Sequence, residues 1–232
     1  MTRPAMRLVP QLVLRIVGLG AALGAALFGG AGTLAWPIGW AFLALFLAFV
    51  IALSLWLLRA NPELLEERMT GIGRTDQEPW DKLLMGLAAF AFFAWLAVMG
   101  LDAVRFRWSR VPAGLRALGA ALLAGAVVLF FLTFRENTFL SPAVRVQAER
   151  GQTVVSTGPY RYVRHPMYAA FIALTAGGAL FLGSWYGLLG CVPLALLVAV
   201  RATLEEQTLS RELAGYDDYV RRVRHRLIPF VW

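Results

Sequence analysis

Long apolar runs are the feature that most constrains what this chain can fold into. They fall at residues 10–32, 37–58, 83–101, 114–134, 167–182 and 186–200. A transmembrane helix needs about 20 mostly apolar residues, and the first four runs reach that length. The last two are shorter and are joined by Gly183-Ser184-Trp185, which predicts a tight helical hairpin. The runs predict an all-α polytopic bundle of five or six membrane-spanning helices with a hairpin near the C-terminus.

Composition supports lipid as the solvent. Hydrophobic residues make up 59% of the 232 and charged residues 16%, whereas a soluble domain is nearer half apolar and a quarter charged. The first run lacks a small-residue cleavage site after a short apolar core, so we interpret it as a retained span. Two regions are expected: transmembrane helices over 1–134, which form a scaffold and offer substrate access, and a catalytic region over 135–232.

The basic residues predict the orientation in the membrane. Net charge is +8, and Lys82 is the only lysine among 22 basic residues. With six crossings and a cytoplasmic N-terminus, 18 of them lie inside, which the positive-inside rule favours, and the C-terminus is cytoplasmic too. The other four basic residues lie outside in this orientation, and the sequence does not explain them. They are Arg105, Arg107, Arg110 and Arg116.

The same charges argue against a nucleic-acid partner, because they are scattered at the ends of apolar runs rather than gathered on one soluble face. Anionic membrane lipids are the expected counterions. Glycines and alanines are frequent in the first run, which suits close helix contact and suggests a homo-oligomer through that helix.

Metal and disulfide chemistry are not expected. Cys191 is the only cysteine and lies inside an apolar run, where packing is its expected role. The two histidines, His165 and His225, are far apart and match no zinc spacing. Between the second and third runs, Asn61-Pro62 reads as a helix N-cap followed by a first-turn proline, which predicts a short interfacial helix.

Polar and aromatic residues become dense from residue 135 onward. Pro166 suits the first position of a helix, so Arg164 and His165 are expected just before the N-terminal end of that helix. Free backbone N–H groups and the helix dipole favour an anion there. Tyr168 follows in the first turn, and a Gly158-Pro159 turn brings Tyr160 alongside. Aromatic faces can hold a sulfonium or an adenine. The alternative interpretation is an interfacial anchor with an aromatic belt.

The far end of the hairpin carries two adjacent carboxylates, Glu205 and Glu206. Both ends of a hairpin return to one membrane face, so the two carboxylates are expected near Arg164 and His165. Glu205 shares a helix face with Arg201, and Glu206 is turned about 100° away. One can pair with an arginine while the other faces a ligand amine or ribose. A solvated charged helix is the alternative.

The C-terminal segment carries several arginines and ends in aromatic and apolar residues. Gly215 is expected to cap the preceding helix. We interpret the arginines as a headgroup-level anchor and assign the segment no chemistry. They are Arg221, Arg222, Arg224 and Arg226.

The combination of Gly158-Pro159-Tyr160, Arg164-His165-Pro166-x-Tyr168, an apolar hairpin and Glu205-Glu206 resembles the isoprenylcysteine carboxyl methyltransferase family. Phospholipid N-methyltransferases and small-thiol methyltransferases are related membrane enzymes. The resemblance covers about residues 135–232 and implies an S-adenosylmethionine-dependent methyltransferase with a cofactor pocket at the cytoplasmic face and S-adenosylhomocysteine as product.

Carried over residue by residue, the resemblance implies a set of cofactor contacts and a set of catalytic residues. Arg201 faces the acceptor, Glu206 is the nearest candidate base for a thiol or amine acceptor, and Asn137 and Glu136 are additions to this site. The implied cofactor-binding residues are Gly158, Tyr160, Arg164, His165, Tyr168, Glu205 and Glu206.

Two other classes of function stay open at this point. A sterol-reductase-like enzyme with a reduced nicotinamide cofactor has a similar C-terminal helical scaffold. A transporter or structural subunit is the non-enzymatic alternative, although a transporter should place ionisable residues near mid-membrane. For a methyltransferase, we expect a lipophilic or membrane-associated acceptor that carries a carboxylate, thiol or amine. The sequence does not distinguish a prenylated cysteine, a phospholipid headgroup, an isoprenoid and a small lipophilic thiol.

Overall fold

The protein is a helix bundle, seen here in a computed structural model that describes residues 3–70, 77–229 and 231–232. These residues form helices and turns and no strand. Arg74, which the orientation argument counts, lies outside the described residues, as do the side chains of Arg3 and Arg7. The elements are α1 Arg3–Ala31, α2 Pro37–Ala60, α3 Pro62–Thr70, α4 Pro79–Gly100, the π-helical turn η1 Leu101–Phe106, α5 Ala113–Glu136, the 3₁₀ turns η2 Ala148–Arg150 and η3 Gly158–Arg161, α6 Pro166–Leu182, α7 Trp185–Glu212 and α8 Tyr216–Arg222.

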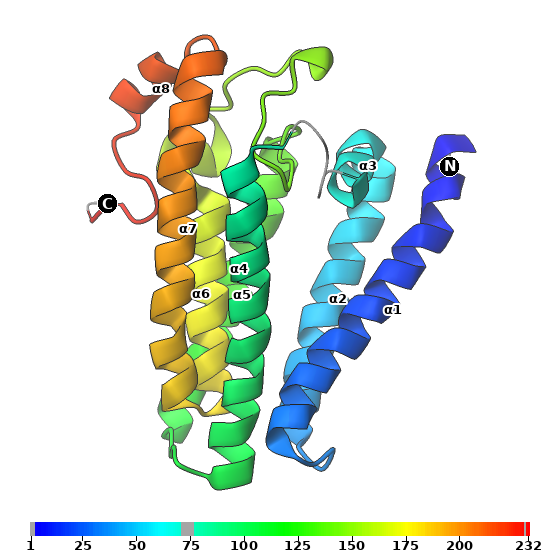
Figure 1. Cartoon of the computed structure of the whole chain (residues 1–232), viewed down its shortest axis with the longest axis vertical. Helices are drawn as coiled ribbons and strands as arrows, with labels where there is room; N and C mark the ends of the chain where they lie inside the picture. Colours follow the sequence, from blue (N-terminus) through cyan, green and yellow to red (C-terminus); the bar gives the residue numbers. More distant parts are fainter. Residues whose placement is uncertain (1–2, 71–76, 230) are drawn as a thin grey trace.

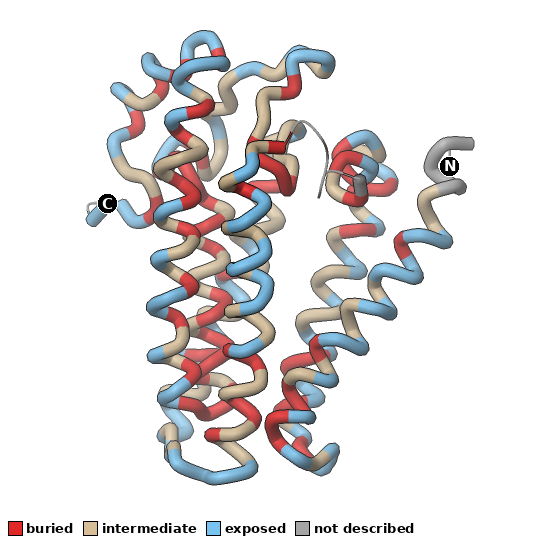
Figure 2. The backbone as a smooth tube through the Cα atoms, viewed as in Figure 1, coloured by how far each residue is buried: buried red, intermediate tan, exposed pale blue. Residues whose placement is uncertain are grey.

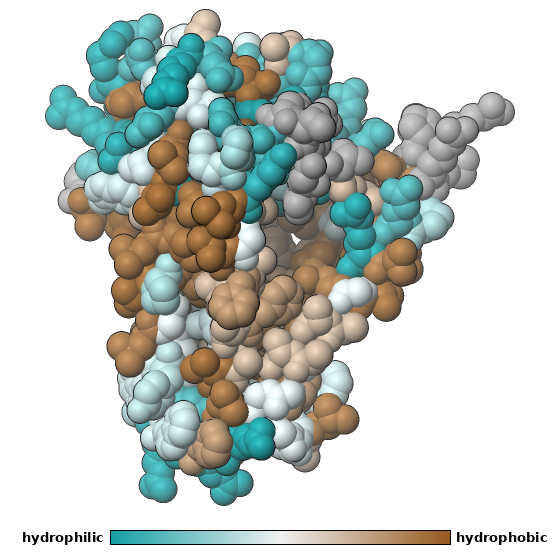
Figure 3. All heavy atoms as spheres, in the orientation of Figure 1, coloured by the Kyte–Doolittle hydropathy of each residue, from teal (hydrophilic) through white to brown (hydrophobic). Residues whose placement is uncertain are grey.

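Five of these helices are long and apolar enough to cross a membrane: α1, α2, α4 with η1, α5 and α7. The shorter α6, of 17 residues, runs alongside them and reaches the same far end (Figure 1). The expected all-α membrane bundle of five or six spans is therefore confirmed. The short helices α3 and α8 lie at one end with the N-terminus, and Figure 3 shows hydrophilic residues gathered there and apolar ones along the helices below. We call this the polar end.

The predicted turn between α6 and α7 is confirmed. Gly183 has φ +87°, a left-handed conformation that glycine adopts without strain, and it ends α6. The Ser184 Oγ then accepts a hydrogen bond from the Gly187 N–H at 2.7 Å and so caps α7. The expected cap at Asn61 is also present, because its Oδ1 accepts from the Leu64 N–H at 3.0 Å and starts α3.

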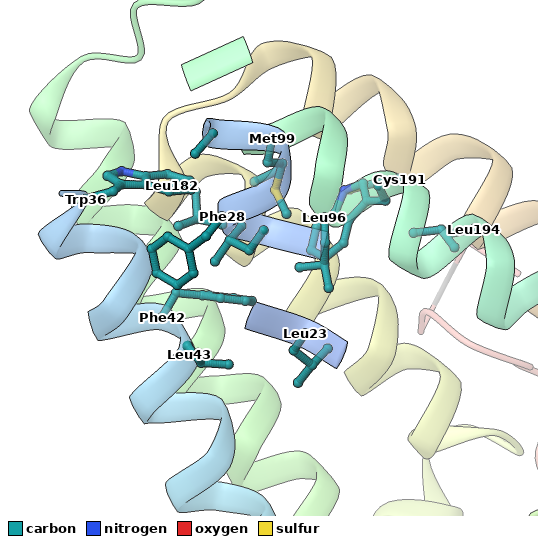
Figure 4. Close-up of a cluster of buried hydrophobic side chains, with 14 residues drawn as sticks. Leu23, Phe28, Trp36, Phe42, Leu43, Leu96, Met99, Leu182, Cys191 and Leu194 are labelled. Carbon is teal, nitrogen blue, oxygen red and sulfur yellow. The ribbon is translucent and has the colours of Figure 1, made fainter. Parts of the chain in front are cut away.

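The largest apolar core lies where α1, α2, α4, α6 and α7 approach one another (Figure 4). Leu96 and Met99 of α4 are fully buried there against Phe28 and Leu182. Cys191 packs in the same cluster, which confirms its predicted packing role. Figure 2 shows buried positions along most of α6, whereas residues 10–18 of α1 are mostly exposed.

Close contact between α1 and α4 depends on glycine. A Cβ at Gly30 would lie 2.2 Å from the Ala97 carbonyl oxygen, so no larger residue fits without a backbone shift. On the open side of α1, a Cβ at Gly18 or Gly29 would meet nothing within 4 Å. Part of the small-residue pattern therefore serves contacts within the chain, and the homo-oligomer through α1 stays a prediction.

Two of the four arginines at the end opposite the polar end lie beside the C-termini of other helices. The Arg116 Nε donates to the Phe181 carbonyl in the last turn of α6 at 3.3 Å. The Arg105 side chain passes next to Gly32, just after α1. Cations are favoured near helix C-termini, so packing within the bundle supplies a reason for these two arginines that the sequence did not show.

Candidate functional site at the polar end

The two ends of the α6–α7 hairpin meet through one carboxylate. Glu206 Oε1 accepts hydrogen bonds from Arg164 Nε at 2.7 Å and pairs with His165 Nε2 at 3.1 Å. Arg226 Nε donates to Glu206 Oε2 at 2.9 Å. The expected proximity of Arg164 and His165 to the acidic pair is therefore confirmed, and Glu206 is the anion on which three basic side chains converge.

Residues 223–226, which follow α8, hold the segment before α6 in place. The backbone N–H groups of Arg164 and His165 donate to the carbonyls of His225 and Arg226 at 3.0 and 2.9 Å. The Arg164 Nη1 also donates to the carbonyl of Val223 at 2.7 Å. The sequence predicted only a headgroup anchor here, so the contribution of Arg226 to the site was missed. One arginine in an arginine-rich segment gives no signal of its partner.

Glu205 faces the opposite way from Glu206. Its Oε2 accepts a hydrogen bond from the Tyr168 hydroxyl at 2.6 Å, and its side chain is 27% exposed against 9% for Glu206. The rings of His165 and Tyr168 stack with centroids 5.4 Å apart. The expectation that one of the two carboxylates pairs with an arginine is confirmed for Glu206. Glu205 lines a pocket, and its expected contact with a ligand stays a prediction.

That pocket contains about 830 Å³ of empty space, counting the part open to solvent. Its walls come from the 137–155 segment, η3, the start of α6, the last turns of α7, and α8. Apolar residues such as Val144, Leu209 and Leu213 alternate with polar ones. Of the residues expected at the site, those that line it are Asn137, Tyr160, Arg164, His165, Tyr168, Arg201 and Glu205.

Gly158 and Glu206 are not among the lining residues. Gly158 has φ +56°, and a Cβ there would lie 2.7 Å from Glu136 Oε2. Glu136 also accepts a hydrogen bond from the Thr157 hydroxyl. The structure thus gives Gly158 a conformational role beside Glu136, and it gives Glu206 an ion-pairing role behind the pocket wall.

Tyr160 is held from two sides. Its hydroxyl accepts a hydrogen bond from Asn137 Nδ2 at 2.9 Å, and its carbonyl accepts one from the Tyr219 hydroxyl at 2.8 Å. Burial raises the pKa of Tyr160 well above its usual value, so the hydroxyl stays neutral at physiological pH. Asn137 and Tyr160 together present a fixed, uncharged polar edge to the pocket.

Arg201 has a buried partner that sequence reasoning missed. Its Nε donates to Asp81 Oδ1 at 2.7 Å and its Nη2 to the Pro142 carbonyl at 2.6 Å. Asp81 is fully buried, and its Oδ2 also accepts from Gln77 and from the Val144 N–H. The sequence showed Asp81 only as one charge just before an apolar run. Arg201 lines the pocket as the expectation requires, but its charge is already paired.

Together, the helices and the pocket define an integral membrane protein with a polar site at one end of the bundle. Residues 115–214 match the PEMT family, phospholipid methyltransferase. The matched segment covers 100 of the 232 residues, less than half of the chain. It contains most of α5, all of α6 and α7, and the 137–165 connection, and therefore most of the pocket wall.

One relative is the nickel-cobalt-cadmium resistance protein NccN of Alcaligenes xylosoxydans xylosoxydans. It is 30% identical over 81 residues, which cover 34% of this chain and 38% of that protein. The match therefore spans less than half the length of the relative.

Proposed function

We propose that this protein is an S-adenosylmethionine-dependent methyltransferase that acts on a lipophilic or membrane-associated acceptor at the cytoplasmic face. The observation that carries the proposal is the pocket itself, where Glu205, Tyr168 and Tyr160 converge within the segment that matches a methyltransferase family. Hydrophilic residues gather at the polar end and apolar residues cover the helices below it (Figure 3), which supports a site shared by a water-soluble cofactor and a lipid-borne acceptor.

The residues present suit this cofactor. S-adenosylmethionine, when bound, supplies an electrophilic methyl group on a positively charged sulfur. Glu205 can accept hydrogen bonds from an amine or from ribose hydroxyls, and its negative charge complements a cationic ligand. The rings of Tyr160 and Tyr168 offer faces for an adenine or a sulfonium. The apolar wall residues offer the remaining surface for packing against the ligand.

The ion pairs next to the pocket position its walls. Glu206 holds Arg164 and His165 at the start of α6, and Asp81 holds Arg201 against the 142–144 segment. A carboxylate engaged by three basic groups is a weak proton acceptor. We therefore propose a positioning role for Glu206, in place of the general base that the sequence suggested, and the same for Asn137 toward Tyr160.

Direct binding tests the proposal. Purified protein in detergent should bind S-adenosylmethionine in calorimetry, and S-adenosylhomocysteine should compete. Glu205→Gln should weaken binding at least tenfold because it removes a charge from the pocket. Glu212→Gln, on the exposed last turn of α7, is the matched control and should bind normally.

The reaction is tested by supplying methyl-labelled S-adenosylmethionine with a total membrane lipid extract. Label should enter an extractable lipophilic product in wild type and fall in Glu205→Gln. If the wild-type protein binds no S-adenosylmethionine at concentrations far above those of cells, the proposed function is wrong.

A further inference from the structure

After α8 the chain turns back and passes beside α7 (Figure 1). We call residues 226–229 and 231–232 the C-terminal strap. Among these residues the buried side chain is that of Leu227, which packs in one cluster with Val198 and Ala202 of α7. The strap is therefore packed on the α6–α7 hairpin, near the ends that carry the candidate site.

The level of the strap along α7 follows from this packing. A stripe of exposed apolar side chains follows one face of α7, three or four residues apart, and ends at Val200. The two partners of Leu227 on α7 flank Val200, so the strap lies where the apolar surface of α7 ends. In a membrane helix this level is the interface between hydrocarbon and headgroups. The stripe consists of Leu189, Val192, Leu196 and Val200.

The strap presents apolar side chains outward at this level. Ile228, Val231 and Trp232 are all exposed. Tryptophan is enriched where hydrocarbon meets headgroups, because its ring is apolar and its N–H is polar. Arg222 and Arg224, which precede the strap, are exposed too, and arginine can place its charge among headgroups while its stem stays in apolar surroundings. The chemistry of the strap thus fits the interfacial layer of a lipid bilayer.

The strap is also tied to the anion behind the pocket wall. The Arg226 Nε donates to Glu206 Oε2 at 2.9 Å, and the Arg226 guanidinium carbon lies 5.0 Å from the centroid of the Trp232 ring. The backbone N–H groups of residues 226–228 all donate to the Trp232 main-chain oxygen, at 2.9 to 3.2 Å. Because Trp232 and Arg226 are held together in this way, the position of Trp232 bears on the ion pair with Glu206.

A second contact joins the strap to the pocket wall. Leu227 packs with Tyr168, whose hydroxyl donates to Glu205 at 2.6 Å. The Arg226 carbonyl accepts from the His165 N–H at 2.9 Å. Neither Arg226 nor Leu227 is among the described residues that line the pocket. Both therefore lie where they can fix the wall without touching a ligand.

We propose that the bilayer interface is the binding partner of the C-terminal strap, and that Arg226 and Leu227 connect this contact to the site as positioning residues. Lipid contact at the exposed apolar side chains keeps both residues on their partners in the site and so orders the pocket wall. The effect on S-adenosylmethionine rests on the function proposed above, whereas the membrane contact and the ordering of the wall do not.

Fluorescence quenching in phosphatidylcholine nanodiscs tests the membrane contact. In a full chain with Cys191→Ser, Val231→Cys carries an environment-sensitive fluorophore, and the quencher is phosphatidylcholine with a nitroxide on its acyl chain near the headgroup. Emission should be blue-shifted and strongly quenched. The same fluorophore at Asp218→Cys, an exposed position in the first turn of α8, is the control and should report water. Equal quenching at the two positions would overturn the membrane contact.

Hydrogen–deuterium exchange tests whether the contact reaches the site, and it needs no cofactor. Ile228→Ser with Val231→Ser removes apolar surface from the strap, and Val13→Ser with Val17→Ser removes it from the exposed face of α1 as the matched control. Backbone exchange over residues 160–168 in nanodiscs should be about two- to thirtyfold faster in the strap variant, the range for coupling through neighbouring contacts. The same exchange in both variants would overturn the coupling.

S-adenosylmethionine affinity in the same preparations extends the test to the ligand. The strap variant should bind about two- to thirtyfold more weakly than the α1 variant. Arg226→Gln should weaken binding as well, whereas the fluorophore at Val231→Cys stays quenched because the strap remains in the lipid. Arg226→Lys, which keeps the charge, should restore part of the loss. Equal cofactor affinity in the strap and α1 variants would overturn the link between strap and site.

The same measurements distinguish this proposal from the proposed function. Quenching at the strap and slow exchange of the pocket wall, without any S-adenosylmethionine binding by the wild type, would remove the proposed function and leave the strap. Cofactor binding without quenching at the strap would do the reverse.

Discussion

The pocket side of the polar end and the α2–α5 side are built by different forces. Around the pocket, buried ion pairs such as Arg164–Glu206 and Arg201–Asp81 hold side chains in single arrangements. Between α2 and α5, apolar and aromatic side chains leave an open groove, and its lining residues carry no charge. A charged, water-soluble ligand needs preorganised polar groups, whereas a lipid chain needs only an apolar opening of suitable width.

We expect the largest effect from removing the Glu206 carboxylate, which lies behind the pocket wall. Glu206→Ala leaves the buried Arg164 without its carboxylate, and loss of one partner of a buried pair costs about 3–5 kcal/mol. We expect a large fall in the denaturation midpoint in detergent and loss of cofactor binding. Glu205→Ala should weaken the cofactor while leaving stability nearly unchanged, since Glu205 is partly exposed. Equal destabilisation by both variants would contradict the division of roles.

Removing one charge from a second buried ion pair should lower the free energy of unfolding by a smaller amount. Asp81→Asn keeps the shape of the side chain but removes the charge opposite Arg201, and we expect about 3 kcal/mol of destabilisation, near the lower end for broken buried pairs. Thermal unfolding followed by circular dichroism measures it. Asp218→Asn, on the exposed face of α8, is the control. If the two variants unfold alike, Arg201 does not depend on Asp81.

The apolar contacts of the N-terminal helices should respond to size rather than charge. Gly30→Ala forces a methyl group against the Ala97 carbonyl, and overpacking of this kind costs about 1–3 kcal/mol. Gly29→Ala adds the same methyl group on the open side of α1, where alanine favours the helix by up to about 1 kcal/mol. The two variants should therefore shift the unfolding midpoint in opposite directions, and a shift of the same sign would show that α1 does not pack on α4 as described.

The sequence predicted the long helices because apolar runs of sufficient length have few other solutions, and it predicted the meeting of Arg164 and His165 with the acidic pair because a hairpin returns both ends to one face. The sequence could not predict which of Glu205 and Glu206 forms the ion pairs. The two residues are adjacent and differ only in the direction in which they point from α7. Asp81 and Arg226 were missed because their partners are distant in the sequence. Asp81 is 120 residues from Arg201, and Arg226 is 20 residues from Glu206. The groove depends on how α2 and α5 sit over α6, which no local pattern specifies.

Photo-crosslinking with methyl-labelled S-adenosylmethionine tests the central claim most directly. Ultraviolet irradiation of the purified protein, followed by peptide mapping, should place the label in the pocket-lining segments 160–168 or 201–213, and excess S-adenosylhomocysteine should abolish it. Label confined to α1 or α2, or label that the competitor does not displace, would contradict a cofactor pocket at the end of the α6–α7 hairpin.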